Sequence, residues 1–262
     1  METRIPKIIL DLYDYRHKFY SSSNSNLTDL PQFSSVRQRT EYIFRWLYDT
    51  HGYAKFIDTA VKLKTIEGLS SEDFGTAKGL IAEIVLSVSI EEWQKQTAVK
   101  DWHYTREFYI QHRKGSGTTE IDIILYSPYT IVVFEVKSYS GKKILKDTCT
   151  IHTKRVHDLF AQNGLHIESL FKILEPLNLS KIGAIKSAYF NFSSGDVEDT
   201  RSPRCKQLIP VIDENNIFTF LEAMRTQCTK YTWDKKVVQK ISALRENGLT
   251  REQHMAQFSD TE

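Results

Sequence analysis

Two apolar segments near the middle of the chain have the length and alternation of paired β-strands. They are TEIDIILYS at 119–127 and IVVFEVKSYSG at 131–141, joined by the link SPY at 127–129. So short a link between apolar strands predicts an antiparallel hairpin. Because side chains alternate faces along a strand, Glu135 and Lys137 point the same way. An acid and a base together on a strand this apolar indicate a site for a divalent metal ion and a phosphate.

The sequence on either side of this hairpin switches between helical and strand-like periodicity. Helices are expected from Ser35, from Ser71, and over roughly 155–175, 215–227 and 233–247. Further strands are expected at 102–112, 140–155, 181–192 and 207–212, and the last residues are expected to form a polar tail. This order of elements favours a three-layer α/β domain with a helical N-terminal addition.

Composition narrows the class of protein but not its partners. The 262 residues are 40% hydrophobic and 26% charged, which is typical of a globular protein with a sizeable core, and the net charge of +2 is too small to indicate a partner. Three cysteines, without metal-ligand spacing, favour a reduced intracellular protein. No window approaches the ~18 apolar residues of a membrane span, so a cytoplasmic protein without a membrane partner is expected.

The candidate chemistry lies in Asp122, Glu135 and Lys137. Mg²⁺ prefers oxygen ligands and usually takes one or two protein carboxylates while keeping several waters. Asp122 and Glu135 lie on neighbouring strands of a tight hairpin, so their side chains can converge at one edge of the sheet. Lys137 would reach whatever the metal ion holds. An isolated E-x-K is most simply a solvated edge strand, but the apolar EID and the SYSG after Lys137 favour a site.

These motifs resemble those of a known nuclease superfamily. An Asp followed thirteen residues later by Glu-Val-Lys, on a strand hairpin, resembles the PD-(D/E)xK superfamily, and the wider sequence over about 74–213 resembles its nuclease-related domain (NERD) branch. The matches are Glu83 in GLIAEIVLS, Glu120 and Asp122 in TEID, EVKSYSG at 135–141, Gln162 and His166 in DLFAQNGLHIESL, and the strand KIGAIKSAYFNF. The chain departs from the branch where Gly79 does not immediately precede Glu83 and where Asp158-Leu159 replaces Asn-Pro.

The resemblance implies a restriction-endonuclease-like core with a mixed central sheet flanked by helices. It divides the chain into a helical N-terminal region at 1–70, a nuclease-like domain at 71–228, and a basic helix and tail at 229–262. What the N-terminal region binds is left open: a protein partner, a second copy in a homodimer, or nucleic acid.

The resemblance also implies roles for individual residues. Asp122 and Glu135 would hold Mg²⁺ or Mn²⁺ together with the Val136 carbonyl. Lys137 would position or activate the attacking water, and Glu83 would orient Lys137 or bind a second metal ion through water. Gln162, with His166 one helical turn away, would contact the scissile phosphate or the nucleophile.

Simpler interpretations of the same residues stay open. Glu83 could be an exposed helix residue, although its apolar neighbours leave only a narrow polar face. His166 could be a partly buried helix residue rather than a site residue. Glu120 shares a face with Asp122 by strand periodicity, and a backup ligand and a surface residue are equally consistent with its position.

Basic residues follow the motif closely and are candidates for contacts to phosphate groups. They are Lys142, Lys143, Lys146, Lys154 and Arg155, with Arg113 and Lys114 in the turn before TEID. A second cluster, Lys230, Lys235, Lys236 and Lys240, is better explained as a solvated face.

The sequence therefore predicts a metal-dependent nuclease that hydrolyses phosphodiester bonds, most simply in DNA, with Mg²⁺ or Mn²⁺ as cofactor. The alternative is an inactive protein of the same fold that serves as a nucleic-acid-binding or protein-interaction scaffold. The presence of all three residues of the trio favours the enzyme. DNA against RNA, and duplex against single strand, stay undecided at this level.

Overall fold

The structure is a computed structural model that describes residues 36–64, 72–112, 117–139, 141–152, 155–157, 159–177, 185–228 and 236–259. The chain forms two compact units, Met1–Val88 and Ser89–Glu262. The domain boundaries predicted at 70/71 and 228/229 stay a prediction. Among the described helices, none is long and apolar enough to cross a membrane.

The first unit is helical where it is described. It contains α2 (Val36–Lys64) and the beginning of α3 (Glu72–Thr97), which confirms the helices predicted from Ser35 and Ser71. Helix α2 is kinked at Gly52, where φ is 77°, a conformation that glycine adopts without the steric cost of a Cβ. Its interior includes Phe44 and Phe56, whose rings meet edge to face at 6.1 Å.

The second unit is built on a mixed five-stranded sheet in the order β1-β2-β3-β7-β9. The strands are β1 (His103–Gln111), β2 (Thr118–Tyr126), β3 (Ile131–Lys137), β7 (Ile185–Asn191) and β9 (Val211–Ile212). Strand β2 runs antiparallel to its neighbours β1 and β3, whereas β7 and β9 run parallel to β3. The predicted hairpin and the α/β class with a mixed central sheet are confirmed.

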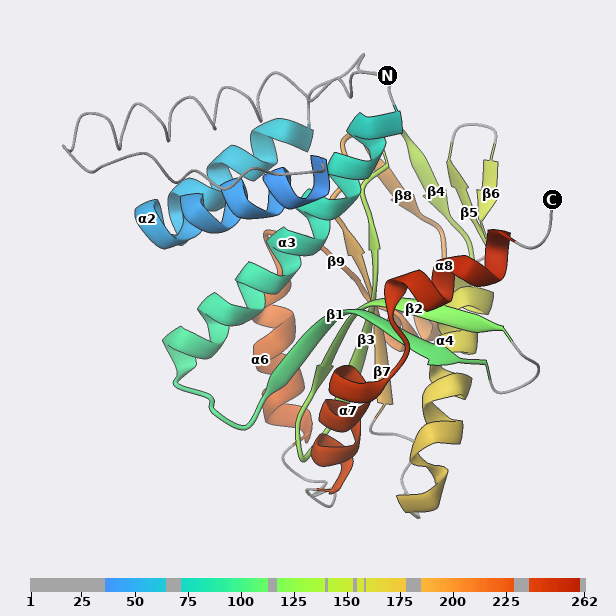
Figure 1. Cartoon of the computed structure of the whole chain (residues 1–262). Helices are drawn as coiled ribbons and strands as arrows, with labels where there is room; N and C mark the ends of the chain where they lie inside the picture. The colour runs from blue at the N-terminus through green and yellow to red at the C-terminus, as the bar shows by residue number, and fades with distance from the viewer. Residues whose placement is uncertain are drawn as a thin grey trace. The chain divides into compact units, whose positions relative to one another are not determined.

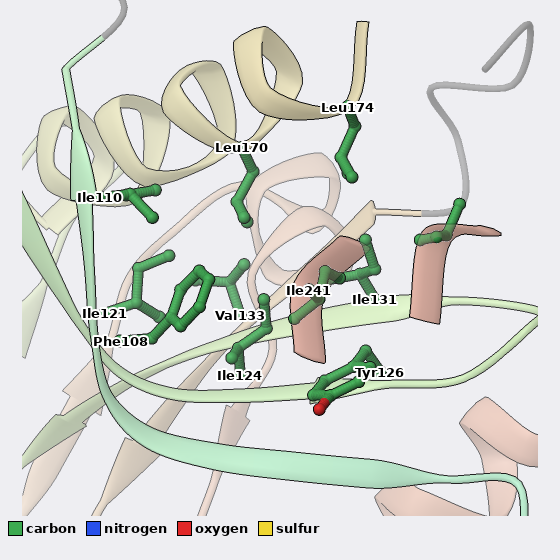
Figure 2. Close-up of a cluster of buried hydrophobic side chains, with 11 residues drawn as sticks. Phe108, Ile110, Ile121, Ile124, Tyr126, Ile131, Val133, Leu170, Leu174 and Ile241 are labelled. Carbon is green, nitrogen blue, oxygen red and sulfur yellow. The ribbon is translucent and has the colours of Figure 1, made fainter. Parts of the chain in front are cut away.

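Helices cover both faces of this sheet (Figure 1). One face packs on α4 (Leu159–Leu174) and α7 (Lys236–Asn247), which ties β1, β2 and β3 into a shared apolar cluster (Figure 2). The other face packs on α6 (Ile217–Cys228), where the ring of Phe220 lies 6.0 Å from that of Phe134. Because side chains alternate along β3, the residues Ile131, Val133, Glu135 and Lys137 face α4.

A second, four-stranded sheet follows the central hairpin, in the order β6-β5-β4-β8. Its strands are β4 (Lys143–Leu145), β5 (Thr150–His152), β6 (Arg155–His157) and β8 (Val197–Asp199). Residues 155–157 were expected to begin a helix and instead form β6, since they pair with β5. Helix α4 is followed at Pro176 by the 3-10 turn η1 (Glu175–Leu177).

Two short helices correct the sequence prediction near the C-terminus. Residues 207–208, expected in a strand, lie in α5 (Pro203–Leu208), because Ser202 caps this helix by accepting from the Cys205 N–H and a proline stands at its start. The expected polar tail contains α8 (Arg251–Ser259). Helix α8 is held by the buried His254, whose Nδ1 lies 2.6 Å from the Thr118 hydroxyl on β2.

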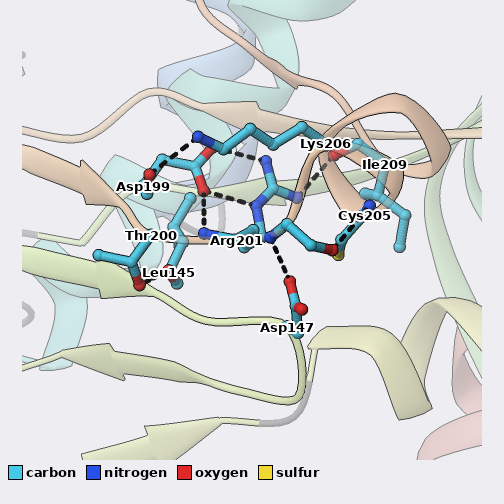
Figure 3. Close-up of polar contacts among 9 residues, drawn as sticks. Leu145, Asp147, Asp199, Thr200, Arg201, Cys205, Lys206 and Ile209 are labelled. Carbon is cyan, nitrogen blue, oxygen red and sulfur yellow. Dashed lines mark hydrogen bonds and ion pairs between the residues drawn. The ribbon is translucent and has the colours of Figure 1, made fainter.

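The end of β8 is fastened by Arg201 (Figure 3). The Arg201 guanidinium donates to both carboxylate oxygens of Asp199 at 2.8 Å and to the Ile209 carbonyl at 2.7 Å. Thr200 donates to the Leu145 carbonyl through its N–H and its hydroxyl, which joins β8 to β4. The bidentate hydrogen bonds from Arg201 hold the pKa of Asp199 below its usual range.

Replacing Asp199 with asparagine is expected to destabilise the protein by about 1.5 kcal/mol at neutral pH, because a charged acceptor is lost from Arg201. A depressed carboxyl pKa stabilises the fold above the unfolded-state value, and this contribution is lost as pH falls through the folded-state pKa. Urea unfolding should therefore separate wild type from Asp199→Asn at pH 7 and bring them together as the pH falls below about 4. A difference that stays constant over this range would contradict the assignment.

Candidate functional site

Asp122, Glu135 and Lys137 meet where the strands of the central hairpin begin to separate. The β2–β3 ladder ends at the pair Ile123 and Phe134, one position before Asp122 and Glu135 would face each other. Beyond it, the Val136 N–H donates to the Asp122 carboxylate at 2.7 Å. The side chain of Asp122 thus accepts a hydrogen bond from β3 where the backbone ladder has ended. It lies beside the strand segment that carries Glu135 and Lys137.

The edge strand β1 is also irregular opposite Asp122. The β1–β2 register pairs residues on either side of Glu107 and Asp122 but skips that pair. Glu107 has a φ of 51°, which is uncommon for a residue with a side chain and costs backbone energy. On β2, Ile121 and Ile124 both enter the cluster of Figure 2, although a regular strand would place them on opposite faces. The sheet is therefore locally distorted around Asp122.

Glu135 is the most enclosed of the three residues. Its side chain is fully buried, the Lys137 ammonium contacts its Oε1, and His166 Nδ1 lies 3.8 Å from its Oε2. Among the described residues, neither of its carboxylate oxygens has a hydrogen-bond partner of good geometry. The contact with Lys137 offsets part of the desolvation cost of this carboxylate, and its oxygens can still accept a further cation or donor.

The ionisation of these groups follows from burial and proximity. Burial raises the pKa of Glu135 above its usual value, against the opposing effect of Lys137. Burial would lower the pKa of Lys137, but the charges of Glu135 and Asp122 outweigh it and raise that pKa. Burial, and then the charge of Lys137, lower the pKa of His166 to about 4. At neutral pH Lys137 is an ammonium ion and His166 a neutral imidazole.

The sequence prediction missed three polar side chains around this site. Strand β7 pairs Tyr189 with Glu135 and Asn191 with Lys137, so both lie next to the motif on the same face. Asn163 on α4 is fully buried, one turn from His166. The Tyr189 hydroxyl, the Asn191 Oδ1 and both amide atoms of Asn163 have no hydrogen-bond partner among the described residues. The polar alternation of β7 was the signal that could have revealed its two residues.

The remaining candidates are placed as follows. Gln162 is half-buried on α4, next to Asn163. Glu83 lies in the first unit on α3, with its carboxylate 4.0 Å from the Arg37 guanidinium, and its role stays a prediction. Glu120 has a carboxylate oxygen 3.3 Å from the Tyr109 hydroxyl, which also lies 3.4 Å from a Glu107 oxygen.

The basic residues after the motif differ in their surroundings. Lys143 is fully buried and donates to the Ser194 carbonyl at 2.9 Å, so its ammonium holds two segments together instead of facing solvent. Lys142 is exposed and pairs with Glu198 at 2.8 Å, and Lys146 is also exposed. Arg155 lies in β6, and Lys154 falls outside the described residues, as do Arg113, Lys114, Lys230 and Lys235.

The oxygen-rich side of the site suits a hard cation but is small. Within the part of the chain that the structure describes, no three or more His, Cys, Asp or Glu side chains are grouped to hold a metal ion. Two carboxylates suffice for Mg²⁺, which keeps several waters. The hydrogen-bonded Asp122 and the enclosed carboxylate of Glu135, without hydrogen-bond donors of good geometry, therefore fit such an ion.

Comparison with known families agrees with this geometry. Residues 78–190 match the family model described as nuclease-related domain, NERD. This segment of the chain is similar to a nuclease-related domain. The matched segment includes Asp122, Glu135, Lys137 and the whole of α4, and it confirms the resemblance seen in the sequence. A search of curated proteins finds no match.

Among solved structures, the crystal structure of protein VC1899 from Vibrio cholerae is similar at 11% identity and a TM-score of 0.34. The alignment covers 89% of this chain and 59% of that chain. A similarity this low carries no argument about the nuclease-related domain.

The Glu135–Lys137 pair gives a stability prediction that is independent of activity. Glu135→Leu alone should destabilise the metal-free protein by on the order of 3 kcal/mol, because it leaves the mostly buried Lys137 ammonium unpaired. The double variant Glu135→Leu/Lys137→Met should recover most of that loss, since apolar residues replace the whole pair. Urea unfolding of wild type, both single variants and the double variant measures the coupling. A double variant no more stable than Glu135→Leu would disprove the pairing.

Proposed function

We propose that this protein is a metal-dependent nuclease that hydrolyses phosphodiester bonds, most simply in DNA. The proposal rests mainly on the buried Glu135 carboxylate, which contacts Lys137 beside Asp122 inside the matched nuclease-related domain. A purely structural pair would gain more from complete hydrogen bonding or from apolar replacement. An enclosed acid whose oxygens have no hydrogen bond of good geometry among the described residues is instead expected where a ligand completes the site.

In the proposed reaction, the oxygen of a water molecule forms a bond to phosphorus and the bond from phosphorus to one sugar oxygen breaks. The water loses a proton to solvent, and the departing oxygen gains one. The Lys137 ammonium, held by Glu135, would stabilise the negative charge that builds on the phosphate oxygens. His166 is neutral and buried behind Glu135, so it would keep that carboxylate facing Lys137.

Mg²⁺ or Mn²⁺ would be held by Asp122, Glu135 and the Val136 carbonyl. A bound ion of this kind would supply Lewis-acid polarisation of the phosphate and a more acidic water. The Val136 N–H donates to one Asp122 oxygen and so orients this carboxylate beside Glu135. Gln162 keeps the supporting role that the family resemblance implies.

The competing proposal is a scaffold with the same fold that binds nucleic acid or protein without turnover. The small carboxylate cluster and the direct contact of Lys137 with Glu135 favour this alternative, because a closed ion pair is also a stable end state.

Asp122→Asn, Glu135→Ala and Lys137→Ala should each reduce Mn²⁺-dependent cleavage by at least about 100-fold, because each removes a group that stabilises the transition state. Purified protein should be incubated with plasmid, linear duplex, single-stranded DNA and RNA, with Mn²⁺ or with EDTA. Gel electrophoresis of the products measures the rates.

Glu168→Ala is the matched control, since it removes an acid from the exposed side of α4 and should cleave like wild type. Calorimetric titration should show Mn²⁺ binding that Asp122→Asn weakens. Cleavage that survives in Glu135→Ala, or wild-type protein that binds no Mn²⁺ and cleaves none of the four substrates, would overturn the nuclease assignment.

The exposed lysines after the motif should govern the salt dependence of binding. Each phosphate contact that is lost lowers the slope of log affinity against log salt by about 0.9 for duplex DNA. Lys142→Ala/Lys146→Ala should therefore reduce this slope by up to about 2 in anisotropy titrations with Ca²⁺. Lys240→Ala, on the exposed side of α7, serves as the control that should leave the slope unchanged. Equal slopes in all three proteins would remove both lysines from the interface.

A further inference from the structure

Helix α4 presents a line of buried residues to the central sheet. They are Asn163, His166, Ser169, Leu170 and Leu174, and their spacing of three and four places them on one helical face. The C-terminal part of this face is apolar, because Leu170 and Leu174 enter the cluster that contains Ile131 and Val133 (Figure 2). The part nearer the N-terminus of α4 is polar.

The order of these contacts shows that α4 and β3 run in opposite directions. Leu170 and Leu174 share a cluster with the first half of β3, whereas His166 reaches Glu135 near its end. From His166 to Asn163 the helix axis rises by about 4.5 Å. From Glu135 to Lys137 the strand extends by about 6.6 Å in the same direction. Asn163 therefore lies at the level of Lys137.

Asn163 has the features of a residue reserved for a ligand. It is 1% exposed, and neither its amide nitrogen nor its amide oxygen has a hydrogen-bond partner among the described residues. A buried carboxamide without partners lowers stability, and a ligand that completes its hydrogen bonds is one explanation for such a group. The neighbouring Gln162 is only half-buried.

We propose that the Asn163 carboxamide contacts the phosphate group on which Lys137 acts, donating through Nδ2 to a phosphate oxygen. This inference rests on the proposed function, because it assumes a phosphodiester at Lys137. It assigns the contact to Asn163, whereas the family resemblance pointed to Gln162. Asn163 and Lys137 would then approach the phosphate from the helix and from the sheet.

The test compares Asn163→Leu with wild type in three measurements: kcat and KM with the preferred substrate and Mn²⁺, the affinity for a short oligonucleotide with Ca²⁺, and the Tm without metal. The expected result is a kcat lower by about 10-fold to 100-fold, with a Tm that is unchanged or higher. The Tm should not fall, because leucine fills the volume without an unpaired amide. Asn163→Ala is the second variant should leucine prevent folding.

Ser169→Ala is the matched control, because Ser169 is also buried and without a partner but lies one to two turns away, beside Leu170. It should leave kcat and affinity within twofold of wild type. Wild-type values of kcat and affinity in both Asn163 variants would overturn the inference, and so would a lower Tm with unchanged kcat, which is the behaviour of a structural asparagine.

Failure of the proposed function gives a different pattern. Wild-type protein that binds the oligonucleotide but does not cleave it would refute the nuclease, and the inference would then be decided by affinity alone. A loss of at least fivefold in Asn163→Leu, with none in Ser169→Ala, would support the phosphate contact. Equal affinity of all variants, or no binding by wild type, would overturn it.

Discussion

The enclosure of Glu135 between β3 and α4 is the constraint on which the arrangement of the site depends. A carboxylate without solvent contact needs a positive partner, and Lys137, two residues along the same strand, supplies it. On the α4 side, Glu135 faces His166, which is neutral and so adds no further charge next to the Glu135–Lys137 pair. The Tyr189 hydroxyl and the Asn191 Oδ1 on β7 lie next to the motif, and Asn163 lies near the beginning of α4. These atoms and the Asn163 carboxamide have no hydrogen-bond partner within the described structure.

Distortion of the sheet gives the site its acidic side. A regular hairpin would use the backbone groups near Asp122 for pairing, and its carboxylate would have no special role. Here the ladders on both sides skip or end at Asp122, Glu107 adopts a left-handed conformation, and the Asp122 carboxylate takes over a backbone donor. The strained backbone of Glu107 therefore lies next to the proposed metal site, and backbone strain is often found at functional sites.

The second sheet shows how a basic stretch is divided between structure and surface. Of the lysines that follow the motif, Lys143 turns inward to the Ser194 carbonyl, while Lys142 and Lys146 remain exposed. The adjacent residues Lys142 and Lys143 are indistinguishable by composition. Their difference arises because Lys143 is the first residue of β4, a strand paired on both sides, whereas Lys142 lies just before that strand.

The sequence by itself determined the central hairpin, the helices around it and the Asp122, Glu135 and Lys137 motif, because strand alternation and helical spacing are local properties. It failed for 155–157, 207–208 and the C-terminal helix, where pairing and capping outweigh local preference. Only the tertiary structure decided that Asn191 accompanies Lys137, that His166 faces Glu135, and that Asn163 is more deeply buried than Gln162. These relations depend on strand register and on the rotation of α4 over the sheet, and long-range packing sets both.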